Sequence, residues 1–214
     1  MESTIQFTFQ IIILIFSVVL HEVSHGYAAL ALGDKTAQYA GRLTLNPLKH
    51  LDPFGSFFLP LFLSLLHLPV IGWARPVPYS PYNLSNQKWG PAFVGAAGPA
   101  ANIFLAVVFG LVIRFIPGFA SGLSGAFLLN FMSIAGLIAL INLMLAFFNL
   151  IPIPPLDGSK VLFAILPYQW RAFQFFLEQY GFFLLLLFIF FFSQWLFPVV
   201  LFFFRLITGT LPFI

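Results

Sequence analysis

The sequence predicts an α-helical membrane protein with about four transmembrane helices. Two properties of its composition support this fold class: 61% of the residues are hydrophobic and only 7% are charged, whereas a soluble domain has about 25% charged residues. The third observation is that the apolar residues are gathered in long runs. A chain of 214 residues has room for one bundle, so we expect a single domain over 1–214, with a core at 5–166 and a C-terminal helix at 179–207.

Five apolar stretches account for the expected helices. A helix needs about 20 residues to cross a hydrocarbon core of about 30 Å, and four stretches are long enough to do so: 5–32, 92–116, 127–151 and 180–207. The fifth, 54–71, is shorter, contains prolines and a histidine, and is flanked by basic segments. Stretches of this length are often re-entrant or interfacial. We therefore expect a re-entrant helix there.

Two segments beside this fifth stretch have extended character. They are TAQYAGRLTL at 36–45 and GWARPVPYS at 72–80. Pro76 and Pro78 cannot donate backbone hydrogen bonds, so the second segment is restricted to an edge or irregular strand. We expect both to be short β segments that flank the re-entrant helix and pack against protein, because backbone at membrane depth must be satisfied internally.

The basic residues predict the orientation in the membrane. If 54–71 does not cross, most of them fall in the two segments that join the helices on one side: Lys35, Arg42, Lys49, Arg75, Lys88, Lys160 and Arg171. Such an excess marks the cytoplasmic side, so the first helix is expected to run inward. The cations form no basic stripe, and we expect no binding to nucleic acid. The absence of cysteine leaves His, Asp and Glu as possible metal ligands.

A metal-binding motif lies in the first apolar stretch, where residues 21–25 read HEVSH. On a helix, His21 and His25 share one face, and at this spacing both imidazoles can reach one tetrahedral zinc ion. Glu22 would then lie beside the open position of the metal. Charged residues at the centre of a bilayer cost roughly 2.5–3.5 kcal/mol or more, so such a cluster indicates a functional site.

A catalytic zinc ion usually has three protein ligands, and Asp157 is the best candidate for the third. It follows a proline-rich break, NLIPIPPLDG at 149–158, near the expected cytoplasmic end of the third long helix. The alternative is that Asp157 only caps a new helix that begins at about Gly158.

Peptide hydrolysis follows from these parts. Zinc lowers the pKa of bound water to about 7 and polarises a carbonyl group, and Glu22 would act as the general base. Asn149 or Asn102 could donate a hydrogen bond to the oxyanion or to substrate carbonyls. An interhelical hydrogen bond is an alternative role for either asparagine.

Three motifs together resemble the site-2 protease family of intramembrane zinc metalloproteases: HEVSHG at 21–26, GPAAN at 98–102 and NLIPIPPLDG at 149–158. GRLTLNPLKHLDPFGS at 41–56 and GWARPVP at 72–78 are similar to the short prokaryotic branch of the family, which has neither a PDZ nor a CBS domain.

The resemblance implies a zinc-dependent endopeptidase that cuts transmembrane segments within the bilayer. It implies one Zn²⁺ per chain bound by His21, His25 and Asp157, with Glu22 as the catalytic base and with Asn149 and Asn102 in contact with substrate. The implied partners are the lipid bilayer and single-pass or unfolded transmembrane protein substrates, presented along the segments 36–45 and 72–80. The implied location is a prokaryotic cell membrane, as a multi-pass protein with its active site toward the cytoplasm.

Two other classes of protein fit parts of this pattern. A transporter or proton-relay protein could use the same buried His, Glu and Asp residues, but the paired inverted repeats of many transporters are not visible. A non-catalytic membrane scaffold could retain a zinc site, although the intact HExxH motif favours an enzyme. The physiological substrate and the oligomeric state are not predicted by the sequence.

Overall fold

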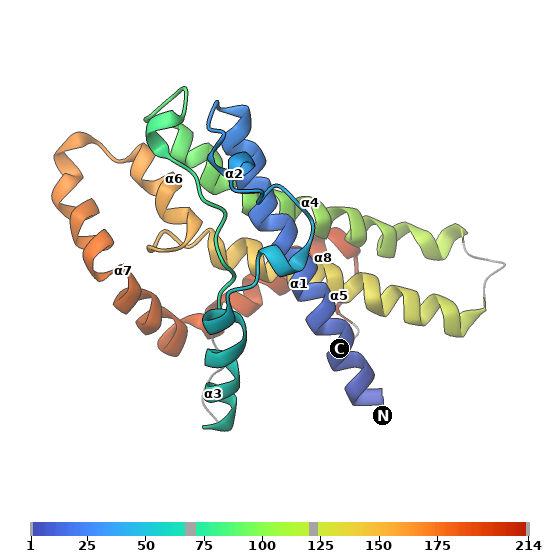
Figure 1. The fold of residues 1–214 in the computed structure, drawn as a ribbon. Coiled ribbons are helices and arrows are strands. Elements are labelled where there is room, and N and C mark those ends of the chain that lie inside the picture. The colour runs from blue at the N-terminus through green and yellow to red at the C-terminus, as the bar shows by residue number, and fades with distance from the viewer. Residues whose placement is uncertain (1, 67–71, 120–123, 213–214) are drawn as a thin grey trace.

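The computed structural model describes residues 2–66, 72–119 and 124–212, and this part of the chain is helical (Figure 1). The long helices are α1 (Glu2–Ala31), α4 (Gly90–Phe119), α5 (Gly125–Asn149) and α7 (Arg171–Phe191). The shorter ones are α2 (Thr36–Tyr39), α3 (Leu59–Leu65), α6 (Asp157–Ile165) and α8 (Leu196–Thr208). A π-helical segment, Pro53–Phe58, leads into α3, and short 3₁₀ turns lie at Pro47–Lys49, Pro81–Asn83, Tyr168–Trp170 and Ser193–Trp195.

Four helices in the described residues are long and apolar enough to cross a membrane. They are Phe7–Ala31, Gly90–Ile116, Gly125–Asn149 and Tyr168–Phe191. The first three confirm the predicted spans, but the single C-terminal helix predicted over 179–207 is wrong. The chain instead forms α7 and α8, separated by the turn at Ser193–Trp195. Pro198 explains the break, because proline is tolerated in the first turn of α8 but cannot continue a preceding helix.

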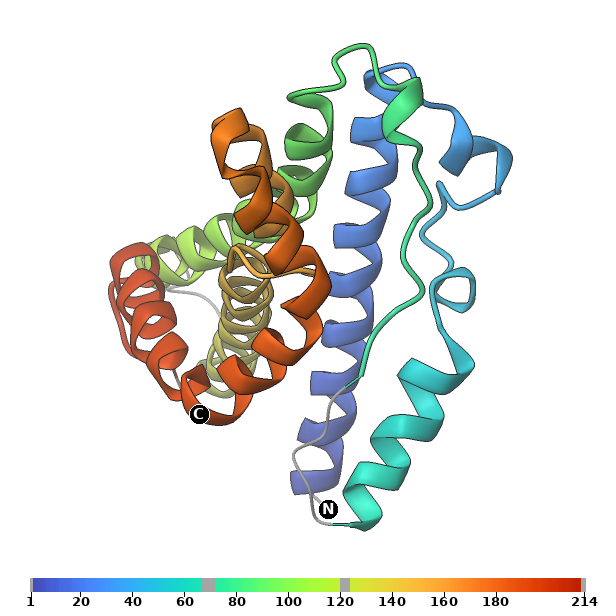
Figure 2. The same ribbon diagram turned by 90° about the vertical axis from the view of Figure 1, so that its left-hand side faces the viewer.

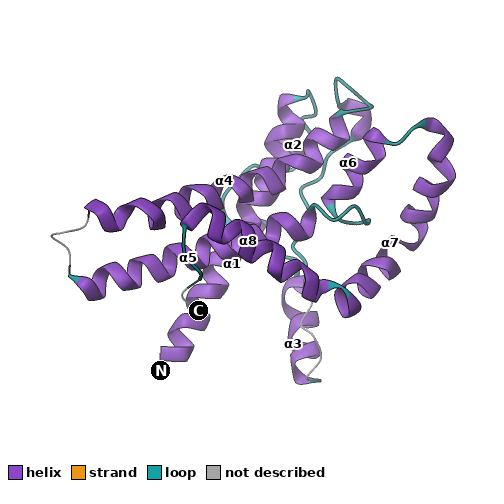
Figure 3. Ribbon diagram, turned by 180° about the vertical axis from the view of Figure 1, so that it is seen from behind, coloured by secondary structure: helices purple, strands orange, loops and turns teal. Residues whose placement is uncertain are grey.

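The core of the bundle lies between α4, α5 and α8. The helices α4 and α5 form an antiparallel hairpin that α1 crosses steeply, and α8 lies against this hairpin (Figures 1 and 3). The buried side chains at their contact are Ala106, Ala139, Leu140, Leu143, Val200 and Phe204. Small residues let the helices approach closely: a Cβ atom on Gly110 would lie 2.6 Å from Cγ2 of Ile207.

The chain just before the predicted re-entrant stretch and the chain just after it lie side by side. Figure 2 shows α3 beside the N-terminal half of α1, and it shows the 72–80 segment running along α1. The backbone N–H of Trp73 donates to the Gly55 carbonyl at 3.1 Å, and the N–H of Arg75 donates to the His50 carbonyl at 2.8 Å. The two ends of the excursion are therefore bonded to each other, as expected of a segment that does not cross. Residues 67–71 of the predicted stretch lie outside the described residues.

The predicted β segments are wrong, because the described residues contain no strand (Figure 3). Residues 36–39 form α2, and Gly41 turns the chain with a φ of 63°. The segment 72–80 is extended but forms no strand, because its neighbour α1 has already used its backbone groups in helical hydrogen bonds. Two of its N–H groups bond to loop carbonyls, as described above, and two others bond to side chains: Val77 donates to Oε2 of Glu22 at 2.9 Å and Ser80 to Oδ2 of Asp34 at 2.7 Å.

Asp34 fastens the end of the 72–80 segment to the end of α1. The carboxylate is fully buried and accepts hydrogen bonds from the backbone and the hydroxyl of Thr36, from the backbone of Ser80 and from the amide of Asn83. Burial alone would raise the pKa of the Asp34 carboxyl, but these hydrogen bonds outweigh burial and lower it. Asp34 is therefore ionised at neutral pH and holds the segment beside α1.

We expect Asp34→Ala to lower the free energy of unfolding by about 1–3 kcal/mol, because it removes a buried acceptor that the Ser80 and Asn83 donors share. Since the pKa is lowered, this contribution is present at neutral pH and is lost as the pH falls through the folded-state value. Unfolding of the purified protein in detergent, measured at neutral and acidic pH, tests both effects. Lys35→Ala, at the exposed neighbouring position, is the control, and equal stability of the two variants would contradict the anchoring role.

Candidate metal centre

Three side chains from two distant helices meet inside the bundle. The helix α1 supplies His21 and His25, and α6 supplies Asp157 at its first residue. The two Nε2 atoms are 3.0 Å apart, and Oδ2 of Asp157 lies 3.0 Å from each of them. All three residues are at most 7% exposed. The potential ligand atoms therefore form a buried triangle with equal edges.

The proline-rich break brings Asp157 to α1. The helix α5 ends at Asn149, the chain turns through 150–156, and α6 begins at Asp157. The turn folds closely on itself, because a Cβ atom on Gly158 would clash with the carbonyls of Leu150 and Ile151. The N-cap residue of α6 makes no side-chain capping bond. The Asp157 carboxylate faces the histidines, so its position differs from that of a helix cap.

The hydrogen bonds on the far side of each ring determine which nitrogen carries the proton. Nδ1 of His25 lies 2.6 Å from the Val94 carbonyl, which can only accept, so Nδ1 is the protonated nitrogen. Nδ1 of His21 lies 2.5 Å from Oδ1 of Asn102. The amide nitrogen of Asn102 donates to Oδ1 of Asn142 at 2.7 Å. This hydrogen bond orients the amide oxygen of Asn102 toward His21. When its ring is neutral, each histidine therefore directs the Nε2 lone pair into the triangle.

Three facing lone pairs repel one another unless a cation lies between them, and their spacing fits zinc. In a tetrahedral site with bonds of about 2.0–2.1 Å, the ligand atoms lie about 3.3 Å apart, close to the 3.0 Å edges of this triangle. Gly98 provides the space, because a Cβ atom there would lie 2.5 Å from Nε2 of His25 and 2.6 Å from Nε2 of His21. The donor set of two imidazoles and one carboxylate is that of a catalytic zinc site.

One face of α4 serves the whole triangle. Val94, Gly98 and Asn102 are four residues apart and so lie on the same side of the helix. The first orients His25 through its carbonyl, the second leaves room for both rings, and the third orients His21. Ligand orientation by a second hydrogen bond fixes the tautomer and the direction of the ring.

Lys160 holds the second oxygen of the carboxylate. Its Nζ atom donates to Oδ1 of Asp157 at 2.9 Å and lies 5.5 Å from the centre of the Tyr79 ring. Burial would lower the pKa of Lys160, but the charge and hydrogen bond of Asp157 outweigh burial and raise it. Lys160 thus stays protonated and leaves Oδ2 to face the histidines.

Glu22 lies between the triangle and the 72–80 segment. One oxygen of its carboxylate is within 4.8 Å of the ligand atoms of His21 and His25. Its Oε2 atom accepts the hydrogen bond from Val77 at 2.9 Å. His21, His25 and Asp157 are buried, whereas Glu22 is half-exposed, so a water molecule or a substrate can reach it.

The two predicted substrate-binding asparagines lie in different surroundings. Asn102 is fully buried behind His21, so its position does not fit a contact with substrate and matches the interhelical alternative. Asn149 is half-exposed at the end of α5, and its amide donates to the Leu145 carbonyl at 2.9 Å. Within the described part of the chain, Asn149 forms no hydrogen bond with His21, His25 or Asp157.

Sequence reasoning missed part of the support for the site. Ser17 is not a candidate metal ligand. Its hydroxyl accepts a hydrogen bond from the Asn142 amide at 2.9 Å and so completes the chain of hydrogen bonds behind His21. Ser17 lies four residues before His21 on the same helix face, which is a usable signal. Lys160 lies three residues after Asp157, and this spacing in a helix also predicts contact.

The chain matches the family model described as Peptidase family M50 over residues 9–191. It is 36% identical over 172 residues to "Putative zinc metalloprotease YwhC" of Bacillus subtilis, covering 80% of this chain and 75% of that protein. It is 36% identical over 152 residues to "Putative zinc metalloprotease Rip2" of Mycolicibacterium smegmatis, covering 69% of this chain and 53% of that protein. For "Zinc metalloprotease MJ0392" of Methanocaldococcus jannaschii the identity is 31% over 168 residues, with 78% and 37% covered. No solved structure matches the chain significantly.

We expect Asn102→Ala to weaken zinc binding by about 10–100-fold, as is typical when a residue that orients a metal ligand is removed. The affinity is measured by competition with a chelator on the purified protein, without substrate. Asn130→Ala is the matched control, because Asn130 is an exposed asparagine on α5. Equal zinc affinity of the two variants would contradict the orienting role of Asn102.

Proposed function

Because this chain belongs to peptidase family M50, we propose that it hydrolyses peptide bonds within the transmembrane segments of other membrane proteins. The family and the relatives make the chain a zinc metalloprotease, and its four long apolar helices make it a multi-pass membrane protein. The observation that carries the proposal is the triangle of lone pairs with Glu22 beside it. His21, Glu22 and His25 lie in α1, a helix that is long and apolar enough to span the membrane.

His21, His25 and Asp157 would hold the zinc ion. When bound, zinc supplies a Lewis acid that polarises a carbonyl group and makes a water molecule acidic near neutral pH. The chain supplies the remaining parts of the reaction. Glu22 takes the proton of the attacking water and delivers it to the nitrogen of the leaving amine. The hydrogen bond from Val77 to Oε2 keeps this carboxylate next to the metal ligands.

The substrate would bind in an extended form along the 72–80 segment. A peptide bond in a transmembrane helix is hydrogen-bonded internally, so the helix must unwind before its carbonyl can be attacked. The 72–80 segment is extended, lies beside α1 and passes Glu22, which makes it a suitable neighbour for an unwound strand. Asn149 is half-exposed at the end of α5 and is proposed to donate a hydrogen bond to the substrate backbone.

A proton-relay role is less compatible with the hydrogen bonds around the histidines. Conduction of a proton through the cluster requires Nε2 atoms that gain and lose protons next to an acceptor. The Val94 carbonyl and Asn102 hold the protons of both rings on Nδ1, which suits two permanent ligands. The geometry therefore favours a metalloprotease over a relay.

We further propose that the active site faces the cytoplasm. Lys35, Arg42 and Lys49 precede the re-entrant helix, whereas Arg75 and Lys88 follow it. The hydrogen bonds that join the two ends of this excursion support their location on one side. An excess of basic residues marks the cytoplasmic side.

Glu22→Gln is expected to keep zinc but to lower cleavage of a transmembrane test substrate by about 10²–10⁴-fold, the usual contribution of a general base. Asp157→Ala is expected to lose zinc as well as activity, because it removes a ligand. Zinc content and cleavage are measured on the same preparations, with the exposed Glu178→Gln as the matched control. Cleavage by Glu22→Gln at the rate of the control would refute the assignment of the base.

Single cysteines test the orientation, because the chain contains no cysteine of its own. We expect cysteines at the exposed positions Lys49 and Lys88 to be labelled by an impermeant thiol reagent in inverted vesicles and to be protected in intact cells. Labelling of the two positions from opposite sides would mean that 54–71 crosses the membrane. Labelling of both from outside would reverse the proposed orientation.

A further inference from the structure

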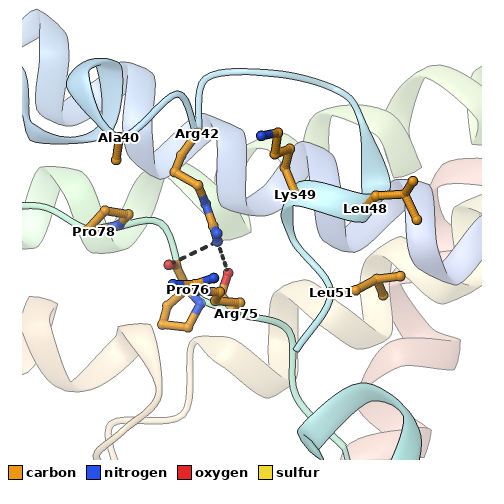
Figure 4. Close-up of a pocket in the computed structure, with 8 residues that line it drawn as sticks. All are labelled: Ala40, Arg42, Leu48, Lys49, Leu51, Arg75, Pro76 and Pro78. Carbon is orange, nitrogen blue, oxygen red and sulfur yellow. Dashed lines mark hydrogen bonds between the residues drawn. The ribbon is translucent and has the colours of Figure 1, made fainter. Parts of the chain in front are cut away.

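A basic cavity lies next to the proposed active site. It has a volume of about 340 Å³ and lies between the loop at 40–51 and the 72–80 segment (Figure 4). Three of its lining residues are cations, namely Arg42, Lys49 and Arg75, and none of the described residues that line it is a carboxylate. The cavity thus concentrates positive charge.

Arg42 is the unusual member of this group, because a charged side chain is rarely buried without a partner of opposite charge. It is 7% exposed, and its Nη2 atom donates to the carbonyls of Arg75 and Pro76 at 2.7 and 3.3 Å (Figure 4). Its Nε atom is buried and has no hydrogen-bond partner in the described residues. Burial and the charge of Arg75 lower the pKa of Arg42, and Glu22 partly offsets them. Arginine nevertheless remains charged, and Arg42 forms no ion pair with a carboxylate among the described residues.

The walls of the cavity are bonded to each other. The N–H of Arg75 donates to the His50 carbonyl at 2.8 Å, and Nε2 of His50 lies 2.8 Å from the Thr44 carbonyl. Arg42 adds the bonds from its own loop to the 72–80 segment. The cations are therefore held around a formed cavity, and a ligand need not assemble it.

The residues that line the cavity suit a ligand with a phosphate group and an apolar part. Arginine and lysine are the side chains that bind phosphate, by forked hydrogen bonds and by point charge respectively. Leu48 and Leu51 line the same cavity and are 76% and 39% exposed. Exposed leucines next to cations suit the boundary between headgroups and acyl chains. The cytoplasmic leaflet is also the one that carries anionic lipid.

We propose that this cavity binds the phosphate of an anionic phospholipid headgroup. The choice of the cytoplasmic leaflet rests on the orientation proposed above, whereas the binding itself does not depend on proteolysis. The cavity shares a wall with the active site. Pro76 and Pro78 line the cavity, and the backbone N–H of Val77 between them donates to Glu22. An occupied cavity would therefore steady the residue that holds the catalytic base.

The test measures lipid binding without substrate. The full-length protein is placed in nanodiscs of phosphatidylcholine with increasing phosphatidylglycerol, and the phosphatidylglycerol that stays bound is counted by native mass spectrometry. We expect Lys49→Gln to weaken retention about fivefold, the effect of one basic residue near an anionic surface. Arg42→Gln should weaken it more. Lys35→Gln is the matched control, because Lys35 is an exposed lysine of the same region that does not line the cavity.

Three results would overturn the proposal. Retention by Lys49→Gln equal to that of the wild type would show that the cavity does not bind the headgroup, even if Arg42→Gln fails to fold. An equal loss in Lys49→Gln and Lys35→Gln would indicate general attraction to an anionic surface. Displacement of phosphatidylglycerol by inorganic phosphate at the same concentration would assign the cavity to a free anion. None of these outcomes depends on whether the protein cleaves peptides.

Discussion

The arrangement of this protein depends on holding three lone pairs together inside an apolar bundle. His21 and His25 are adjacent on one helix, but Asp157 is 136 residues away from His21, and its carboxylate must reach the same point. Without a cation these groups repel one another, and without hydrogen bonds on their outer sides the rings would be free to turn away. The surrounding helices therefore have to position the donors and also determine which nitrogen is protonated.

The helix α4 makes most of the contacts that position the two histidines. Its face supplies a carbonyl at Val94, an open space at Gly98 and an amide at Asn102, so a small rotation of α4 would disturb both histidines. The packing of α4 against α5 and α8 is thereby connected to the metal centre. Asn142 on α5 and Ser17 on α1 extend the polar chain behind His21. The apolar core and the polar site are thus two parts of one packing arrangement.

Local patterns predicted that His21, His25 and Asp157 would lie close together, as they do, but they predicted the connections around these residues less well. The spacing of His21 and His25 is set by helix geometry alone, and the proline-rich break indicated where Asp157 would lie. The β segments were wrong because hydrogen bonding in the 72–80 segment is decided by its neighbour, which is a helix and offers side chains such as Glu22 and Asp34 instead of a strand edge. The C-terminal helix was wrong because hydropathy does not register a turn at Ser193–Trp195 within an apolar run. The role of Asn102 requires knowing which helix faces His21, and one sequence does not contain that information.

Gly98 has a consequence for comparing sequences of such proteins. The position requires glycine, because even the methyl group of alanine would clash with the Nε2 atoms of both histidines. A variant with alanine at this position would retain HExxH and Asp157 and would change only the first residue of the GPAAN motif at 98–102. Such a protein would lose its metal site through a change in α4, a helix that supplies neither a metal ligand nor the catalytic base.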